Sequence, residues 1–154
     1  MVTLLYGGLP NSSRWYDVAP AGATVGSRAV LYLRRRDGVS ARRFRNVVNT
    51  QLVPAMTAAG SLQELRTQTF LPWNKKLWDT PNVAHDNPKG QRFHASVILG
   101  FADDAAREAF FSSQGVTDLS ENLKPLVAAI HAYDVTAALT YVKNGRALTH
   151  YEEA

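Results

Sequence analysis

Hydrophobic and polar positions along the chain predict five short β-strands. Residues 28–34 form a compact β-prone run that ends at a turn. Apolar and polar residues alternate in 62–71 and again in 91–101, which is the period of a strand with two different faces. Residues 126–135 predict a fourth strand, and 138–142 predict a further edge strand before the turn-forming Asn-Gly pair that follows.

Helical periodicity appears between these strands. Apolar residues recur at steps of three and four after Ser40, which can cap a helix, and the pattern ends at Gly60. Pro54 predicts a kink, or an end of the regular helix near Val53, because proline cannot continue the hydrogen-bond ladder. Acidic residues before 105–113 predict a second helix that ends at a glycine, and 120–123 predict one or two further helical turns.

The alternation also predicts which side chains share a face of each strand. In 91–101, one face is the more apolar and is expected to pack against helices; it holds Phe93, Ala95, Val97, Leu99 and Phe101. His94, Ser96 and Ile98 lie on the other face. Tyr32 is expected to point the same way as His94, unless a β-bulge changes the phase.

The predicted order is strand, helix, strand, long loop, strand, helix, strand. A shift of 66 residues aligns its halves, with Leu31 on Val97 and Phe44 on Phe110. Two such units predict an α+β fold: a ferredoxin-like split βαβ repeat with a four-stranded antiparallel sheet and both helices on one face. The second face would then be bare, which predicts that a second copy of the chain covers it in a homodimer.

The chain divides into three parts. Residues 1–27 are rich in Gly, Pro, Asn and Ser and predict an N-terminal arm without long regular structure, whose Trp15 and Tyr16 are at least half covered by the domain. Residues 28–143 form the domain, with a long loop at 72–90, and 144–154 form a C-terminal tail.

Composition limits the possible chemistry. With 154 residues, 45% hydrophobic and 19% charged, the chain predicts one folded, soluble, cytoplasmic domain without a membrane segment. The absence of cysteine excludes disulfides, thiolate catalysis and iron–sulfur clusters. The formal charge of +4 is modest, and six arginines between Arg34 and Arg45 are interpreted as a solvated face rather than a nucleic-acid site. No metal-ligand spacing or glycine-rich phosphate loop is present, so no metal or cofactor is expected.

Two features carry a resemblance to a known family. The first strand leads through Arg-Arg-Asp-Gly-Val-Ser into a helix, and the segment from Gln91 to Phe110 is an aromatic strand running into an acidic helix cap. Over about Arg28 to Val142, the chain resembles the dimeric α+β barrel superfamily, and within it the small EthD-type domain proteins. The resemblance implies a pocket in each protomer between sheet and helices, used by relatives for cofactor-free cyclisation, isomerisation, decarboxylation or oxygenation, while some relatives bind haem. Ser112 to Leu126 holds no His or Tyr, so the histidine mechanism of the olivetolic acid cyclase-like branch does not carry over.

The candidate catalytic residues are three histidines and a tyrosine. Imidazole exchanges protons near neutral pH, which makes His85, His94 and His131 candidate acids or bases. Tyr32 is the candidate hydrogen-bond donor to a developing oxyanion. For each histidine, the alternative is an ordinary hydrogen-bonded structural or solvated residue.

Four residues are candidates for binding a substrate. Trp73 and Trp78 in the long loop can line an aromatic slot or simply pack the loop, and Tyr133 shares a predicted strand with His131. Arg66 can receive a carboxylate or phenolate, or it can pair with Glu64.

These observations predict a homodimeric, cofactor-independent acid–base enzyme, a cyclase, isomerase or decarboxylase. Its substrate would be small and aromatic or polyketide-like. A cofactor-free or haem-dependent monooxygenase and a non-catalytic small-ligand-binding dimer are the alternatives.

Overall fold

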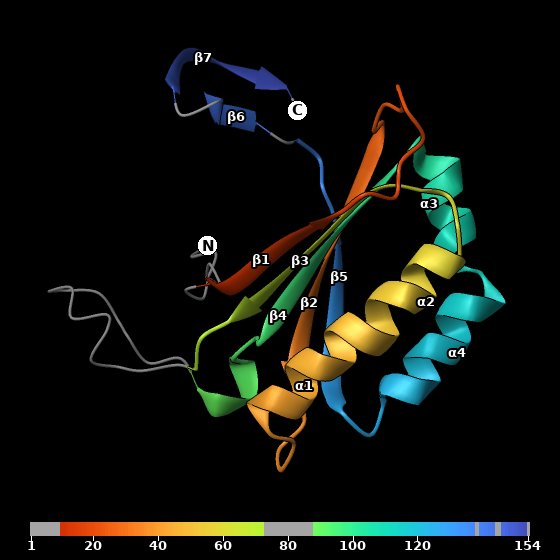
Figure 1. The fold of residues 1–154 in the computed structure, drawn as a ribbon, viewed down its shortest axis with the longest axis vertical. Helices are drawn as coiled ribbons and strands as arrows, with labels where there is room; N and C mark the ends of the chain where they lie inside the picture. The colour runs from red at the N-terminus through yellow and green to blue at the C-terminus, as the bar shows by residue number, and fades with distance from the viewer. Residues whose placement is uncertain (1–9, 73–87, 138, 144–145, 154) are drawn as a thin grey trace, which may run out of the picture.

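The computed structural model describes residues 10–72, 88–137, 139–143 and 146–153. Its centre is a five-stranded antiparallel sheet in the order β1-β3-β4-β2-β5. The strands of this sheet are β1 (Pro10–Tyr16), β2 (Ser27–Arg35), β3 (Leu62–Phe70), β4 (Ala95–Phe101) and β5 (Val127–Asp134). The helices α1 (Ala41–Val47), α2 (Val53–Ala58), α3 (Asp104–Phe111) and α4 (Gln114–Leu123) all cover one face of it (Figure 1).

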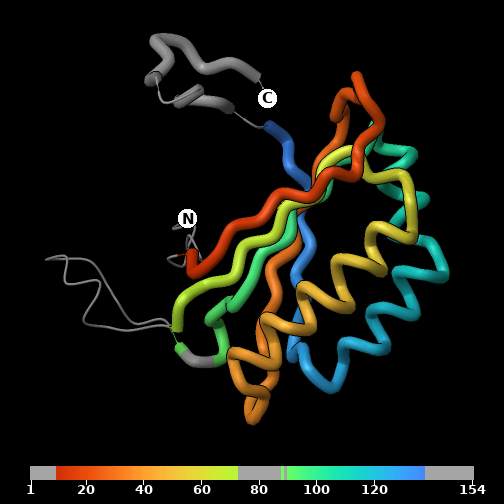
Figure 2. Tube along the Cα trace, in the orientation of Figure 1, coloured from red at the N-terminus to blue at the C-terminus, as the bar shows by residue number. Residues whose placement is uncertain are grey.

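The four strands β2 to β5 and their connecting helices confirm the predicted ferredoxin-like α+β arrangement. Each unit runs from a strand through helices into a second strand, and β2 and β4 pair at the centre. Leu31 and Val97, which the 66-residue shift aligns, are direct partners across these central strands. The helices form a single layer, as the Cα trace shows (Figure 2), so the other face of the sheet is not covered by this layer. We call that second surface the open face.

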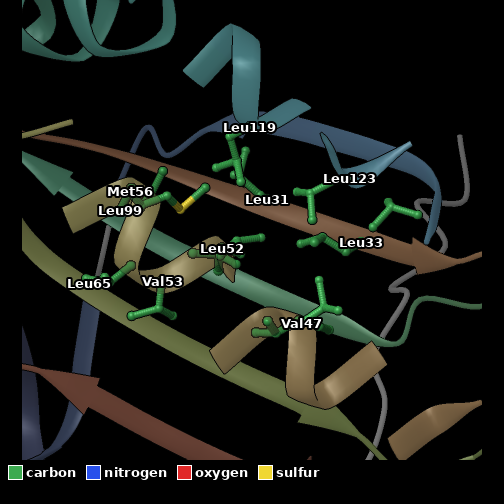
Figure 3. Close-up of a cluster of buried hydrophobic side chains, with 14 of the residues drawn as sticks. Leu31, Leu33, Val47, Leu52, Val53, Met56, Leu65, Leu99, Leu119 and Leu123 are labelled. Carbon is green, nitrogen blue, oxygen red and sulfur yellow. The ribbon is translucent and has the colours of Figure 1, made fainter. Parts of the chain in front are cut away.

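The core lies between the sheet and the helix layer. Leu52 and Val53 from the helical segment meet Leu65 and Leu99 from the sheet, while Leu119 and Leu123 of α4 lie beside Leu31 and Leu33 (Figure 3). The largest of the fully buried side chains are Phe44 and Phe101. The resemblance places a pocket in this layer, whereas in the described part of the chain these apolar side chains fill it.

The predicted helix from Ser40 to Gly60 forms with a defect at the expected place. Ser40 caps α1, because its side chain accepts a hydrogen bond from Arg43 N, and Gly60 follows the last turn with φ +75°. Between α1 and α2 the chain is π-helical, a segment named η1 (Val48–Leu52). Pro54 is the second residue of α2, and the wider turn before it accommodates the missing N–H and the bulk of the proline ring.

The prediction of a four-stranded sheet and of an N-terminal arm without regular structure is wrong for residues 10–16. These residues form β1, an edge strand that pairs with β3 and makes the sheet five-stranded. Tyr16 packs toward the helices, and its hydroxyl contacts Asn49 Oδ1 at 3.4 Å and Thr67 Oγ1 at 3.2 Å. Trp15 faces the other way and is 67% exposed, so it is not half covered as expected.

The remaining elements were either not predicted from the sequence or differ from the prediction in their bounds or partners. A short 3₁₀ helix, η3 (Lys89–Gln91), ends the long loop. Helix α4 begins six residues earlier than the predicted turn, because Ser113 caps it by accepting a hydrogen bond from Val116 N. The predicted edge strand is β6 (Leu139–Lys143), which pairs with β7 (Arg146–Glu153) in the tail rather than with the main sheet. No helix of the described residues is long and apolar enough to cross a membrane.

Candidate functional site

The strand register arranges the side chains of the open face in rows that cross the sheet. One row holds Trp15, Arg66, Ile98, Val30 and Tyr133, each the direct partner of the next. The adjacent row, two residues along each strand, holds Ser13, Gln68, Ser96, Tyr32 and His131. A third row contains Glu64, Gly100 and Arg28. Most polar side chains of the described sheet that could bind a ligand or transfer a proton therefore share this face.

Tyr32 and His131 stand side by side at the centre of an aromatic group. They are direct partners across β2 and β5, which places their Cβ atoms about 5 Å apart. The ring of Phe93 lies 5.2 Å from the ring of Tyr32 and 5.3 Å from that of His131. Tyr133 meets Tyr32 edge-on at 6.1 Å. The structure thus brings together three of the predicted site residues, Tyr32, His131 and Tyr133.

His94 lies elsewhere, on the helix side of the sheet. Its ring is 6.1 Å from that of Phe44 in the core, whereas Phe93 joins Tyr32 on the open face. The expectation that His94 shares the face of Tyr32 is therefore wrong, and Phe93 and His94 exchange the predicted sides. The reason is that regular pairing starts at Ala95, so strict alternation does not extend back to these two residues.

The hydrogen bonds of His94 connect it to the neighbouring strands β2 and β3. Its Nδ1 accepts a hydrogen bond from Arg35 N at 3.1 Å, and its backbone bridges Leu33 O and Phe70 N at the end of the ladder. Burial lowers its pKa from 6.5 to about 4, and the positive charges of Arg35, Arg34 and Arg92 act in the same direction, against the opposing Asp37. The imidazole is therefore neutral at physiological pH.

Arg66 belongs to a charged cluster at the other end of the open face. Glu64 is only 9% exposed; its Oε2 accepts a hydrogen bond from Arg28 Nε at 2.8 Å, and its Oε1 pairs with Arg66. The alternative of an Arg66–Glu64 pair is thus confirmed. The guanidinium of Arg66 also lies over the indole of Trp15, with its central carbon 3.1 Å from the ring centroid.

The other sequence candidates are not part of this assembly. His85, Trp73 and Trp78 lie outside the described residues and stay predictions. Within the described ranges, no three His, Asp or Glu side chains come close enough to bind a metal ion. Sequence reasoning gave Phe93 and Trp15 no role at a site, whereas it named Glu64, which is in phase with Arg66 along β3, as a possible partner of Arg66.

Three of the six arginines in the arginine-rich segment donate hydrogen bonds to backbone carbonyls. Arg34 donates to Gly90 O, Arg35 to Val39 O, and Arg36 to Lys124 O. A polar groove of about 520 Å³ runs along the outer side of α1; it is lined by Ser40, Arg42, Arg43, Asn46 and Asn49. Arg42 and Arg43 are exposed, and the interpretation of this segment as a solvated face rather than a nucleic-acid site stays a prediction.

Comparisons with known proteins agree at the level of the fold. The chain aligns over 75% of its length with 99% of a protein of Arabidopsis thaliana, At3g17210, at 11% identity and a TM-score of 0.51. It aligns over 71% of its length with 90% of a hydroxynitrile lyase from Passiflora edulis, at 16% identity and a TM-score of 0.50. A dimeric ferredoxin-like protein from Thermobifida fusca aligns over 76% of this chain and 96% of its own, at 12% identity and a TM-score of 0.46.

The shared fold is ferredoxin-like. No protein-family model matches the chain, and no curated protein matches its sequence. At these identities the similarity to the first two proteins shows the shared fold alone. The reaction depends on the chemistry of the site.

Proposed function

We propose that the chain is a cofactor-independent acid–base enzyme that works as a homodimer on a small aromatic or polyketide-like substrate. The observation that carries this proposal is the pairing of Tyr32 with His131 on the open face, between the rings of Phe93 and Tyr133. A phenol and an imidazole next to apolar ring surfaces are the groups needed to bind a flat substrate and move a proton on it. At least one protein of this fold, the hydroxynitrile lyase of Passiflora edulis, is a lyase.

The roles follow from the chemistry of the two side chains. His131 removes a proton from the carbon next to a carbonyl group, and Tyr32 donates a hydrogen bond to the oxyanion that develops on that carbonyl. Cyclisation, isomerisation and decarboxylation share this enolate-like charge. His94 is less suited to the task, because a pKa of about 4 makes it a weak base at neutral pH. We assign it to holding the start of β4 in place. His85 remains a second candidate base.

The homodimer accounts for the exposed aromatic groups of the open face. Trp15 is 67% exposed and Tyr133 is 49% exposed, although both stand in a row with the apolar Ile98 and Val30. A sheet with helices on one face only is stable when another layer covers the second face. A second copy supplies that layer and excludes water from Tyr32 and His131, which strengthens the electrostatic interactions there. Sedimentation at micromolar concentration tests this, and a monomer at all concentrations contradicts it.

Proton exchange tests the chemistry without knowledge of the natural substrate. The probe is 2-tetralone, an aromatic ketone with acidic protons next to its carbonyl, and the measurement is the loss of these proton signals in D₂O by NMR. We expect the wild type to accelerate exchange over buffer. His131→Ala should lower the enzymatic rate by about 10²- to 10⁴-fold, and Tyr32→Phe should lower it as well.

His94→Asn is the matched control, since it alters a histidine outside the proposed pair. It should keep the wild-type exchange rate at pH 7. Wild-type rates in both His131→Ala and Tyr32→Phe would disprove the catalytic roles of His131 and Tyr32. Oxygen uptake with an aromatic substrate, in the absence of proton exchange, would instead support the alternative that the protein is a monooxygenase.

A further inference from the structure

Arg66 has binding capacity that its internal partners do not use. Its only ion-pair partner among the described residues is Glu64, and Arg28 engages the same carboxylate. The Nε atom of Arg66 is buried without a hydrogen-bond partner. Burial lowers the pKa of Arg66, yet guanidinium stays charged in proteins. A cation that shares its one counter-charge is a good receptor for a second anion.

Trp15 lies against one side of this cation, and the Arg66 side chain keeps 31% of its surface exposed. The guanidinium carbon lies over the indole, 3.1 Å from the ring centroid, so the aromatic face supports the cation. Because β1 is an edge strand and Trp15 is 67% exposed, the two side chains form a platform at the border of the open face. Trp15 belongs to the segment that the sequence predicted as an irregular arm, so the platform exists only because β1 joins the sheet.

Gly100 keeps the charged cluster on the surface of the sheet. It lies on β4 between Arg28 of β2 and Glu64 of β3. A Cβ at this position would come within 2.6 Å of Glu64 Cβ and 3.2 Å of Glu64 Oε2. The glycine therefore leaves room for the Arg28–Glu64 bridge to cross the central strand, and the bridge in turn holds Glu64 beside Arg66.

The strand register gives the distance from Arg66 to the proposed catalytic pair and the side chains that lie between them. Arg66 and Tyr32 are two strands and one row apart, which corresponds to about 12 Å between their Cα atoms. The apolar side chains of Ile98 and Val30 continue the row of Arg66. In the next row, Gln68 Oε1 accepts a hydrogen bond from Ser96 Oγ at 3.2 Å, so the amide N–H₂ of Gln68 serves as a further donor.

We propose that Arg66, supported by Trp15, binds the carboxylate of an aromatic acid substrate whose reacting end reaches Tyr32 and His131. This assignment rests on the proposed function and narrows its substrate class to planar carboxylic acids of one or two fused rings. A planar acid of one or two fused rings held by the guanidinium can lie across the apolar side chains of Ile98 and Val30, which continue the row of Arg66 toward β2. Arg66 fixes the orientation of the ring, and the catalytic pair acts at its far end.

The test measures binding rather than turnover. The probes are 1-hydroxy-2-naphthoate and its uncharged analogue 1-hydroxy-2-naphthamide, titrated into the wild-type protein by calorimetry at pH 7. We expect the acid to bind at least about tenfold more tightly than the amide. Arg66→Gln should weaken binding of the acid by about tenfold or more and leave binding of the amide unchanged. Arg66→Lys should recover part of the loss, because it restores the charge without the planar fork.

Two further variants isolate the role of the cluster. Arg14→Gln removes an equal charge from the same edge strand, but Arg14 pairs with Thr67 on the other face, so binding of the acid should not change. Glu64→Gln removes the internal competitor for Arg66 and should tighten binding of the acid. If the cluster served only stability, the two variants Arg66→Gln and Glu64→Gln would not change the affinity for the acid in opposite directions.

Each outcome decides the proposal. Equal binding of acid and amide, no binding of the acid by the wild type, or unchanged affinity in a folded Arg66→Gln variant overturns it. If circular dichroism shows that Arg66→Gln does not fold, the acid-to-amide ratio of the wild type and the Glu64→Gln result decide instead. Failure of the proposed function is a separate result, because it appears as wild-type proton exchange in His131→Ala.

Discussion

Replacing His94 by Asn should remove the part of the acid sensitivity of the fold that arises from this imidazole. The folded protein lowers the pKa of His94 from 6.5 to about 4, chiefly by burial. Between these values the unfolded chain takes up a proton that the folded chain does not, so the free energy of unfolding falls as the pH drops from 6.5 to 4 and is fully restored above 6.5. At 1.36 kcal/mol for each pKa unit, the loss is at most about 3 kcal/mol. Screening by water at a half-buried ring reduces it to about 1–2 kcal/mol.

Asparagine is the informative substitution because its Oδ1 can replace Nδ1 as the acceptor for Arg35 N and does not titrate. Urea unfolding at a fixed protein concentration, at several pH values from about 4.5 to about 7.5, gives the free energy of each protein. The difference between wild type and His94→Asn should shrink by about 1–2 kcal/mol toward the acid end. Parallel curves for the two proteins would show that His94 is not buried as a neutral group, and the reasoning would fail.

Two other changes test the framework around the site by urea unfolding. Gly100→Val places a side chain against Glu64 and should cost about 3 kcal/mol by overpacking and by breaking the bridge to Arg28, and a loss below about 1 kcal/mol would argue against the close approach. Ser40→Ala removes the cap of α1 and should cost about 1 kcal/mol, with the urea dependence unchanged, whereas Ser40→Gly should cost only a few tenths. An equal loss in both Ser40 variants would rule out the capping bond as the cause.

The hydrophobic pattern is sufficient to predict the central layer of this fold. Leu31 and Leu33 share a face because the period of a strand is two, and both lie in the core. The helix from Ser40 to Gly60 was predictable from its caps and its apolar spacing, and Pro54 even marked the place of its π-helical defect. These are local signals, and each needs only a few neighbouring residues to be recognised.

Long-range pairing explains what the sequence did not show. The segment from Pro10 has turn-forming residues and becomes a strand only because the edge of β3 accepts it, with proline at its first position. The glycine at 115 suggested the end of a helix, whereas Ser113 begins a new one there. The Arg28–Glu64–Arg66 cluster depends on the register of three strands, which no local pattern determines.

The same dependence on register decides which histidine can meet a substrate. Alternation counted back along β4 places His94 beside Tyr32, but the ladder begins at Ala95 and the residue before it turns into the helix layer. The register of β2 with β5 instead places His131 beside Tyr32. The half-buried imidazole of His94, with a pKa of about 4, is a poor proton acceptor at neutral pH, whereas His131 is exposed on the open face, although the sequence presents the two alike. The proposed assignment of the base to His131 therefore follows from strand pairing, and it predicts a loss of proton exchange in His131→Ala but not in His94→Asn.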